Sequence, residues 1–148
     1  MKNNRTGLYV GSFNPFTAGH ADIARRALAV FDRLVIAVGV NHDKPAPDTA
    51  SRIAEIAALF ASEPRVEVTE CRGLTACMAA ELGAVLVRGV RNVRDFEYER
   101  DMADINRRLT GVDTVVFFAS PQLGAVSSSL VRELEHYGAD ISQFMPQS

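Results

Sequence analysis

Short apolar segments alternate with longer segments of helical periodicity along this chain, and this alternation constrains the fold more than any other feature. Parallel strands are joined through helices, and strands covered on both faces read as continuous apolar runs. The pattern therefore predicts a doubly wound α/β fold with a five-stranded parallel sheet. The predicted strands are 8–11, 34–40, 66–69, 85–88 and 114–119, and the predicted helices are 18–31, 49–61, 74–82, 93–109 and 129–137.

The size and composition of the chain favour one domain over residues 1–148. Of these residues 47% are hydrophobic, and no linker or repeat interrupts them. The first residues are too few and too polar for a signal peptide, and no apolar run approaches the ~20 residues of a membrane span. Cys71 and Cys77 form neither a CxxC pair nor a disulfide framework. We therefore expect a cytoplasmic protein without a membrane partner.

The charged residues exclude one class of partner. The net charge is -2, and the chain has no run of like charge, so a nucleic-acid partner is not expected. Lys2 and Lys44 are the only lysines among 16 cations, and the rest are arginines, which suit bidentate phosphate binding. The spacing of His42 and His136 suggests no metal site. Small anionic ligands are the expected partners.

The strand order predicts where such a ligand would bind. In the common order 3-2-1-4-5 the sheet reverses its winding between the first and fourth strands, and ligands bind beyond their carboxyl ends. The turn at residues 11–20 follows the first strand, and the segment after Val87 follows the fourth. We therefore expect these two segments to face each other across a crevice.

The turn at residues 11–20 has the composition of a phosphate site. Gly11 and Gly19 allow a ligand to approach the backbone, and the next helix begins here with unpaired N–H groups. Ser12, Thr17 and His20 add hydroxyls and an imidazole. The alternative is an ordinary turn in which His20 only caps the helix.

The segment after Val87 carries Arg88 and Arg91 on either side of a glycine. Either arginine could form an ordinary ion pair with a nearby carboxylate, at Asp95, Glu97 or Glu99. Their position at the end of a strand, opposite a phosphate-type turn, instead favours binding of a ligand phosphate.

Three further positions are candidates with simpler alternatives. Lys44 lies in a loop after the second predicted strand, where a lysine is ordinarily solvated but here neighbours the crevice. Thr75 opens a predicted helix, as threonines commonly do. The serines at 127–129 enter the last predicted helix, where their hydroxyls could cap the helix or hold an anion.

Three of these segments together carry a family resemblance. Gly-Ser-Phe-Asn-Pro-Phe-Thr-Ala-Gly-His at 11–20 resembles the signature of nucleotidyltransferases with a Thr-x-x-His or His-x-x-His motif, and looks most like the phosphopantetheine adenylyltransferases. Arg-Gly-Val-Arg at 88–91 with Asp-Phe-Glu-Tyr-Glu at 95–99, and Val-Ser-Ser-Ser at 126–129, resemble that family's other two motifs. Two departures are Asn14, where the family has Asp, and Ala50-Ser51, where it has Glu-Glu.

The resemblance implies a Rossmann-like nucleotidyltransferase fold and a reaction. The adenylyl group of ATP would pass to 4'-phosphopantetheine, giving dephospho-coenzyme A and pyrophosphate in coenzyme A biosynthesis. Mg²⁺ would bridge the ATP phosphates, held mainly by ligand oxygens rather than by a dedicated protein cage, and the protein would form a homohexamer. The resemblance implies His20, Lys44 and Arg91 as catalytic residues, and Ser12, Lys44, Thr75 and Arg88 as binding residues for the acceptor. It implies that the nucleotide contacts Ser12, Phe13, His20, Gly89, Val90, Arg91, Glu99, Leu123, Gly124, Ala125, Val126, Ser127, Ser128 and Ser129.

Two other functions remain open at this point. Adenylyltransferases that act on nicotinate or nicotinamide mononucleotide share the fold and the turn, but usually have a second histidine where Thr17 stands. A nucleotide-binding regulatory domain without catalysis is the other alternative, with Asn14 as the substitution that favours it.

Overall fold

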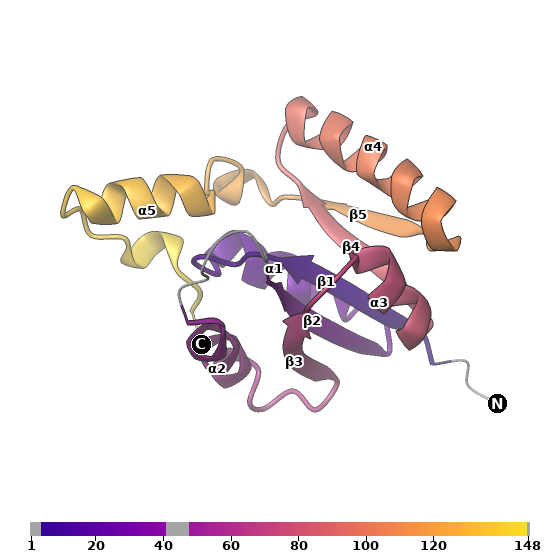
Figure 1. Ribbon diagram of the computed structural model, residues 1–148. Helices are drawn as coiled ribbons and strands as arrows, with labels where there is room; N and C mark the ends of the chain where they lie inside the picture. Colours follow the sequence, from indigo (N-terminus) through magenta and orange to yellow (C-terminus); the bar gives the residue numbers. More distant parts are fainter. Residues whose placement is uncertain (1–3, 41–47, 148) are drawn as a thin grey trace.

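The computed structural model describes residues 4–40 and 48–147, and within these residues five strands form one parallel sheet (Figure 1). The strands pair in the order β3-β2-β1-β4-β5, as the alternating pattern predicts. Their bounds are β1 Thr6–Gly11, β2 Arg33–Gly39, β3 Val66–Cys71, β4 Ala84–Val90 and β5 Thr114–Phe118.

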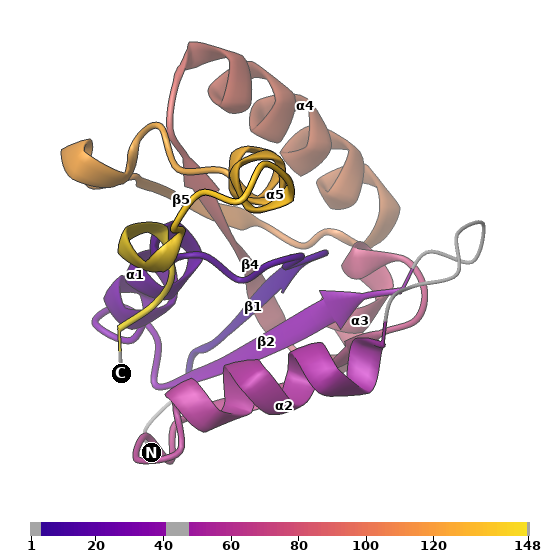
Figure 2. The ribbon, with the colours of Figure 1, turned by 90° about the vertical axis from the view of Figure 1, so that its left-hand side faces the viewer.

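Helices α1 to α4 connect successive strands, α5 follows β5, and helices cover both faces of the sheet. They are α1 Ala18–Ala27, α2 Thr49–Leu59, α3 Thr75–Leu82, α4 Val93–Thr110 and α5 Ser128–His136, with short 3₁₀ turns at η1 Pro121–Leu123 and η2 Ser142–Phe144. Helices α1 and α2 pack on one face, where Figure 2 shows α2 lying along β2, and α3 packs on the other.

The first helix ends earlier than its apolar spacing predicts. Phe31 continues the apolar period and is buried in the core, but it lies beyond the end of α1. The N–H groups of Asp32 and Arg33 both donate to the carbonyl of Arg5, at 2.8 and 3.2 Å. These bonds direct the chain into β2, so tertiary hydrogen bonding overrides the helical period here.

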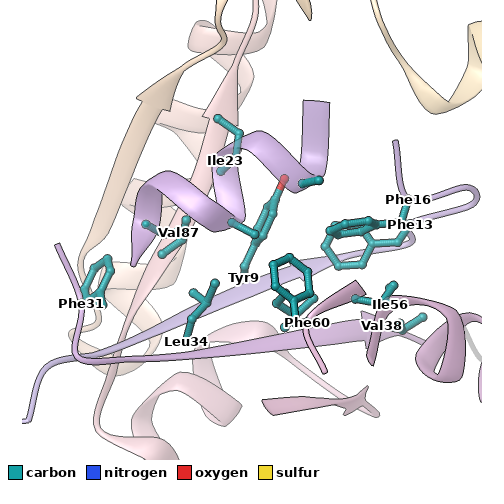
Figure 3. Packing of buried hydrophobic residues seen from close by; sticks show 14 residues of the cluster. Tyr9, Phe13, Phe16, Ile23, Phe31, Leu34, Val38, Ile56, Phe60 and Val87 are labelled. Atoms are coloured by element: carbon teal, nitrogen blue, oxygen red, sulfur yellow. The ribbon is translucent and has the colours of Figure 1, made fainter. Parts of the chain in front are cut away.

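Two apolar clusters lie on the two faces of the sheet because successive strand residues point to opposite sides. One contains Tyr9, Phe13, Ile23, Leu34 and Phe60 with their neighbours, and Figure 3 shows their side chains between the strands and α1. The other contains Leu8 and Leu86 together with the small residues of α3.

Strands β1 and β4 pair over only a few residues, and this short pairing determines where the sheet opens. The two strands pair only over Thr6↔Ala84, Gly7↔Val85 and Leu8↔Leu86, although β1 continues to Gly11 and β4 to Val90. The strands therefore separate toward their carboxyl ends. In the part of the chain that the model describes, no helix is long and apolar enough to cross a membrane.

Burial of Leu34 gives a first prediction. Leu34 is 0% exposed, whereas Leu82 is 37% exposed. We expect Leu34→Ala to lower the free energy of unfolding by about 2–5 kcal/mol, because it removes a buried side chain and leaves a cavity. The control Leu82→Ala should cost less than about 1 kcal/mol. Urea unfolding followed by circular dichroism would measure both, and equal losses would contradict the described core.

Candidate active site

A cavity of about 350 Å³ opens where β1 and β4 separate. Its walls come from the turn after β1, the end of β4, the start of α4 and the start of α5. The two segments that were expected to face each other across the crevice therefore do so. The residues that line it include Ser12, Phe13, Thr17, Gly19, His20, Arg88, Gly89, Val90, Arg91, Glu99, Leu123, Val126, Ser127 and Ser128.

The turn after β1 is held in shape by a capping box at the start of α1. Thr17 is the N-cap, and its Oγ1 accepts from the N–H of His20 at 3.4 Å. In return, Nδ1 of His20 accepts from the N–H of Thr17 at 3.0 Å. His20 thus caps the helix and lines the cavity at once, and binding of a phosphate by this residue stays a prediction.

The same contacts determine which ring nitrogen of His20 can donate. Nδ1 accepts a backbone N–H, so the proton of the neutral imidazole must lie on Nε2. Burial and, to a smaller extent, the positive charges of Arg88 and Arg91 together lower the pKa of His20 to about 4. At neutral pH the ring is therefore a neutral donor beside the cavity.

Aromatic rings surround this imidazole. The ring centroids of Phe13 and Phe16 lie 5.1 and 5.5 Å from that of His20. Phe13 has a φ of 46°, and a Cβ on Gly11 would lie 2.7 Å from its ring. Gly11 is therefore required for the close approach of the Phe13 ring to the strand. This packing requirement is separate from any contact of Gly11 with a ligand.

The two motifs at opposite ends of the sequence are joined through backbone carbonyls. The hydroxyl of Ser128 donates to the carbonyl of Pro15 at 2.7 Å, and the guanidinium of Arg132 donates to the carbonyl of Asn14. These bonds fasten α5 to the turn after β1. Ser127 caps α5, since its Oγ accepts from the N–H of Leu130 at 3.1 Å.

Both arginines of the β4 segment form ion pairs, and both also line the cavity. Arg88 donates to Glu99 through Nε and Nη2, each at 2.7 Å, and Arg91 Nε lies 3.1 Å from Asp95 Oδ2. The ion pairs therefore lie in the wall of the cavity, and binding of a ligand phosphate by these arginines stays a prediction. Glu97 is exposed and faces neither cavity.

A second cavity, of about 790 Å³, adjoins the first on the α3 side of the sheet. The two share a wall formed by residues 10–12, Arg88, Tyr98 and Glu99. This second cavity brings Ser12, Thr75 and Arg88 together, as three of the four residues expected to bind one substrate. The fourth, Lys44, lies outside the described residues.

The residues that line the two cavities differ in part from those expected from the sequence. Tyr98, Met102 and Asn106 line the second cavity from one side of α4, and their spacing of four residues was the only signal of this in the sequence. Tyr9 lines the first cavity. Gly124, Ala125 and Ser129 line neither cavity, although they lie beside residues that do.

The carboxylates of the site do not form a metal centre. Within the two described ranges, no three His, Cys, Asp or Glu side chains gather as metal ligands. Asp95 and Glu99, the carboxylates that border the first cavity, are both held by arginines.

The lowered pKa of His20 predicts a pH dependence of stability. Below about pH 6.5 the imidazole of the unfolded chain binds a proton, and the folded protein does not do so until about pH 4. Acidification therefore removes stability, and at pH 5 the loss is about 2 kcal/mol relative to pH 7. We expect the free energy of unfolding of His20→Gln to fall by about 2 kcal/mol less than that of the wild type between pH 7 and pH 5. Urea unfolding at both pH values would measure this difference. His136→Gln, at an exposed histidine, is the control, and an unchanged pH dependence in His20→Gln would contradict the assignment.

Comparison with known proteins places the chain in a family. A cytidylyltransferase-like family model matches residues 8–134. The phosphopantetheine adenylyltransferase of Porphyromonas gingivalis is 49% identical, covering 99% of this chain and 97% of the relative. That of Phocaeicola vulgatus is 43% identical, covering 97% and 96%.

A solved structure supports the fold independently of sequence. A structure described as a nicotinate-nucleotide adenylyltransferase from Vibrio parahaemolyticus superposes with a TM-score of 0.68 at 14% identity, covering 97% of this chain and 88% of that one. At this identity the likeness concerns the fold alone. The three sequence motifs lie around two adjoining cavities. Because the curated relatives are 43–49% identical over nearly the whole chain, this chain belongs to the phosphopantetheine adenylyltransferase family of nucleotidyltransferases.

Proposed function

We propose that this protein transfers the adenylyl group of ATP to 4'-phosphopantetheine, releasing pyrophosphate and forming dephospho-coenzyme A in the cytoplasm, as one domain. One observation carries the proposal most directly. Two cavities meet at a shared wall that holds a cationic side chain, Arg88, at the carboxyl ends of β1 and β4. This arrangement suits a reaction in which the phosphates of two substrates must meet.

The chemistry of the walls supports one substrate for each cavity. The first cavity has the N-terminal ends of α1 and α5, the imidazole of His20 and the guanidinium of Arg91, which suit the phosphates of ATP. The second has Thr75 and Arg88 at one side and apolar side chains such as Met102 at another, which suit a phosphate with an extended, partly apolar arm. Ser12 borders both and would position the reacting groups.

The reaction needs no general base, because the acceptor phosphate is already an anionic nucleophile. Its oxygen attacks the α-phosphorus of ATP in line, a new P–O bond forms, and the bond to pyrophosphate breaks. His20 donates through Nε2–H to an oxygen that gains charge in the transition state. Arg91, oriented by Asp95, supplies a fixed positive charge, and Lys44 would supply a mobile one.

Magnesium would enter with ATP. The described residues offer no carboxylate cage for it, so the phosphate oxygens of ATP would be its main ligands. Bound in this way, it would neutralise phosphate charge, and the protein's own residues would act on the α-phosphate.

The proposal extends to a homohexamer, which the family resemblance suggests. Helix α4 supports self-association, since Tyr98, Met102, Ile105 and Leu109 recur on one side of it at helical spacing and are 37–61% exposed. A second copy of the chain would remove this apolar surface from water.

The choice of acceptor gives a direct test. We expect magnesium-dependent pyrophosphate release from ATP with 4'-phosphopantetheine, with dephospho-coenzyme A as the product, and none with nicotinate or nicotinamide mononucleotide. Chromatography of the products would measure both. Release only with a mononucleotide would assign the chain to the sister activity, and ATP binding without release would indicate a regulatory domain in which Asn14 is not tolerated.

The role of His20 gives a second test. His20→Ala should lower kcat by roughly 10²–10³-fold, as for loss of a donor to the transition state, with a much smaller effect on ATP affinity. Steady-state kinetics and calorimetric ATP titration would separate the two effects. His136→Ala, at an exposed histidine of α5, is the control. Equal losses in kcat and ATP affinity would remove His20 from the chemical step.

A further inference from the structure

The segment between β5 and α5 forms part of the wall of the first cavity. It covers residues 119–127 and contains η1. Three of its apolar side chains line the cavity, at Ala119, Leu123 and Val126, and Ile23 of α1 lines the same cavity. Apolar side chains of this kind suit the faces of a nucleotide base, which are also apolar. We call residues 119–126 the base wall.

Hydrogen bonds within the base wall determine its shape. The N–H of Leu123 donates to the carbonyl of Ser120 at 2.8 Å, and the N–H of Val126 donates to the carbonyl of Leu123 at 3.0 Å. These bonds join residues three apart, so they form turns but do not place the turns relative to the sheet. The position of the base wall depends on the contacts at its two ends.

Asp22 of α1 provides a contact at the β5 end of the base wall. The hydroxyl of Ser120 donates to Asp22 Oδ2 at 2.8 Å, between residues 98 positions apart in the chain. Ser120 is the N-cap residue of η1, but its side chain does not cap that turn. Its hydroxyl instead joins the turn to α1. Because the acceptor is a carboxylate, this bond belongs to the stronger, charge-assisted kind.

Arg26 lies one helical turn after Asp22 and holds the chain just before the base wall. Its Nη1 donates to the carbonyl of Phe118 at 2.6 Å and lies 3.3 Å from Asp22 Oδ2. Its guanidinium carbon lies 5.7 Å from the centroid of the Phe117 ring. Asp22 therefore contacts both side chains that join α1 to this part of the chain, Arg26 and Ser120.

We infer that Asp22 is a positioning residue for the nucleotide base, which it serves through Ser120 and Arg26 by holding the base wall at the first cavity. The inference rests on the proposed function, because it takes ATP as the occupant of that cavity. Asp22 lines neither of the two cavities, so its effect on ATP passes through the base wall. If the wall is in place in only a fraction of the molecules, the apparent dissociation constant for ATP rises in inverse proportion to that fraction.

Removal of the Ser120 hydroxyl is the first test. We expect Ser120→Ala to raise the KM for ATP by about 3- to 10-fold, because it removes a hydrogen bond to a charged group. The kcat should stay within about twofold, since the wall contacts the base equally in the ground state and the transition state. Ser120→Thr keeps a hydroxyl and should restore the wild-type KM. Steady-state kinetics would measure these values, and calorimetric titration would measure ATP affinity directly.

The other substrates show whether the effect is confined to the base. The KM for 4'-phosphopantetheine, and the KM for pyrophosphate in the reverse reaction, should change by no more than about twofold in Ser120→Ala. Neither molecule has a base to place against the wall. A rise in the KM for pyrophosphate equal to that for ATP, or a fall in kcat with an unchanged KM for ATP, would overturn the inference.

A double-mutant cycle tests the place of Asp22. Asp22→Ala should raise the KM for ATP by about 5- to 30-fold, because both Ser120 and Arg26 lose a charged partner. Ser120→Ala in the Asp22→Ala background should add no more than about twofold, because the residue that binds the hydroxyl is gone. Independent, multiplying effects would contradict the inference.

Asp104→Ala is the matched control for Asp22→Ala. Asp104 forms an ion pair of the same spacing on α4, with its Oδ2 3.0 Å from Arg108 Nε, and it lines neither cavity. This variant should leave the KM for ATP unchanged. If Asp22→Ala does not fold, as judged by circular dichroism, the Ser120 variants decide alone. Failure of the proposed function would look different, because the wild type itself would then form no dephospho-coenzyme A.

Discussion

The short pairing of β1 with β4 is the constraint on which the rest of the structure depends. After Leu8↔Leu86 the two strands continue without pairing to each other, and backbone hydrogen bonds no longer hold them together. Instead, the guanidinium of Arg88 on β4 donates to the carbonyl of Val10 on β1 and links the two strands. Pairing of β1 with β4 that extended further along the strands would close the crevice. Loss of the Arg88 side chain would leave the buried carboxylate of Glu99 without its ion-pair partner.

Two further features of the site follow from helix geometry. The capping box that begins α1 fixes His20 by both its backbone and its ring, so the start of the helix also selects the nitrogen that can donate. Burial and two neighbouring arginines then keep the pKa of His20 low, and the ring stays neutral at pH 7. In the proposed reaction, such a donor would require no rearrangement of the protein when charge develops on a substrate oxygen.

Much of this could be predicted from sequence because it depends on local patterns. Apolar runs predict the strands, the winding rule predicts the crevice, and the three motifs contain His20, Arg88, Ser127 and Ser128, which line the first cavity. The ion pairs could not be predicted with the same ease. From the sequence, ion pairing and ligand binding of Arg88 look like alternatives, although a guanidinium has enough donors for both. Met102 and Asn106 were missed because their place depends on how α4 lies against the sheet, which is a tertiary property.

The contacts that fasten α5 to the turn use main-chain carbonyls at Asn14 and Pro15. Any side chain at position 14 presents the same carbonyl, provided that the backbone keeps its course. Asn14, where the family resemblance has Asp, therefore leaves this fastening intact while the turn after β1 carries one negative charge fewer. The charge at position 14 can thus change without loosening the contact between α5 and the turn after β1.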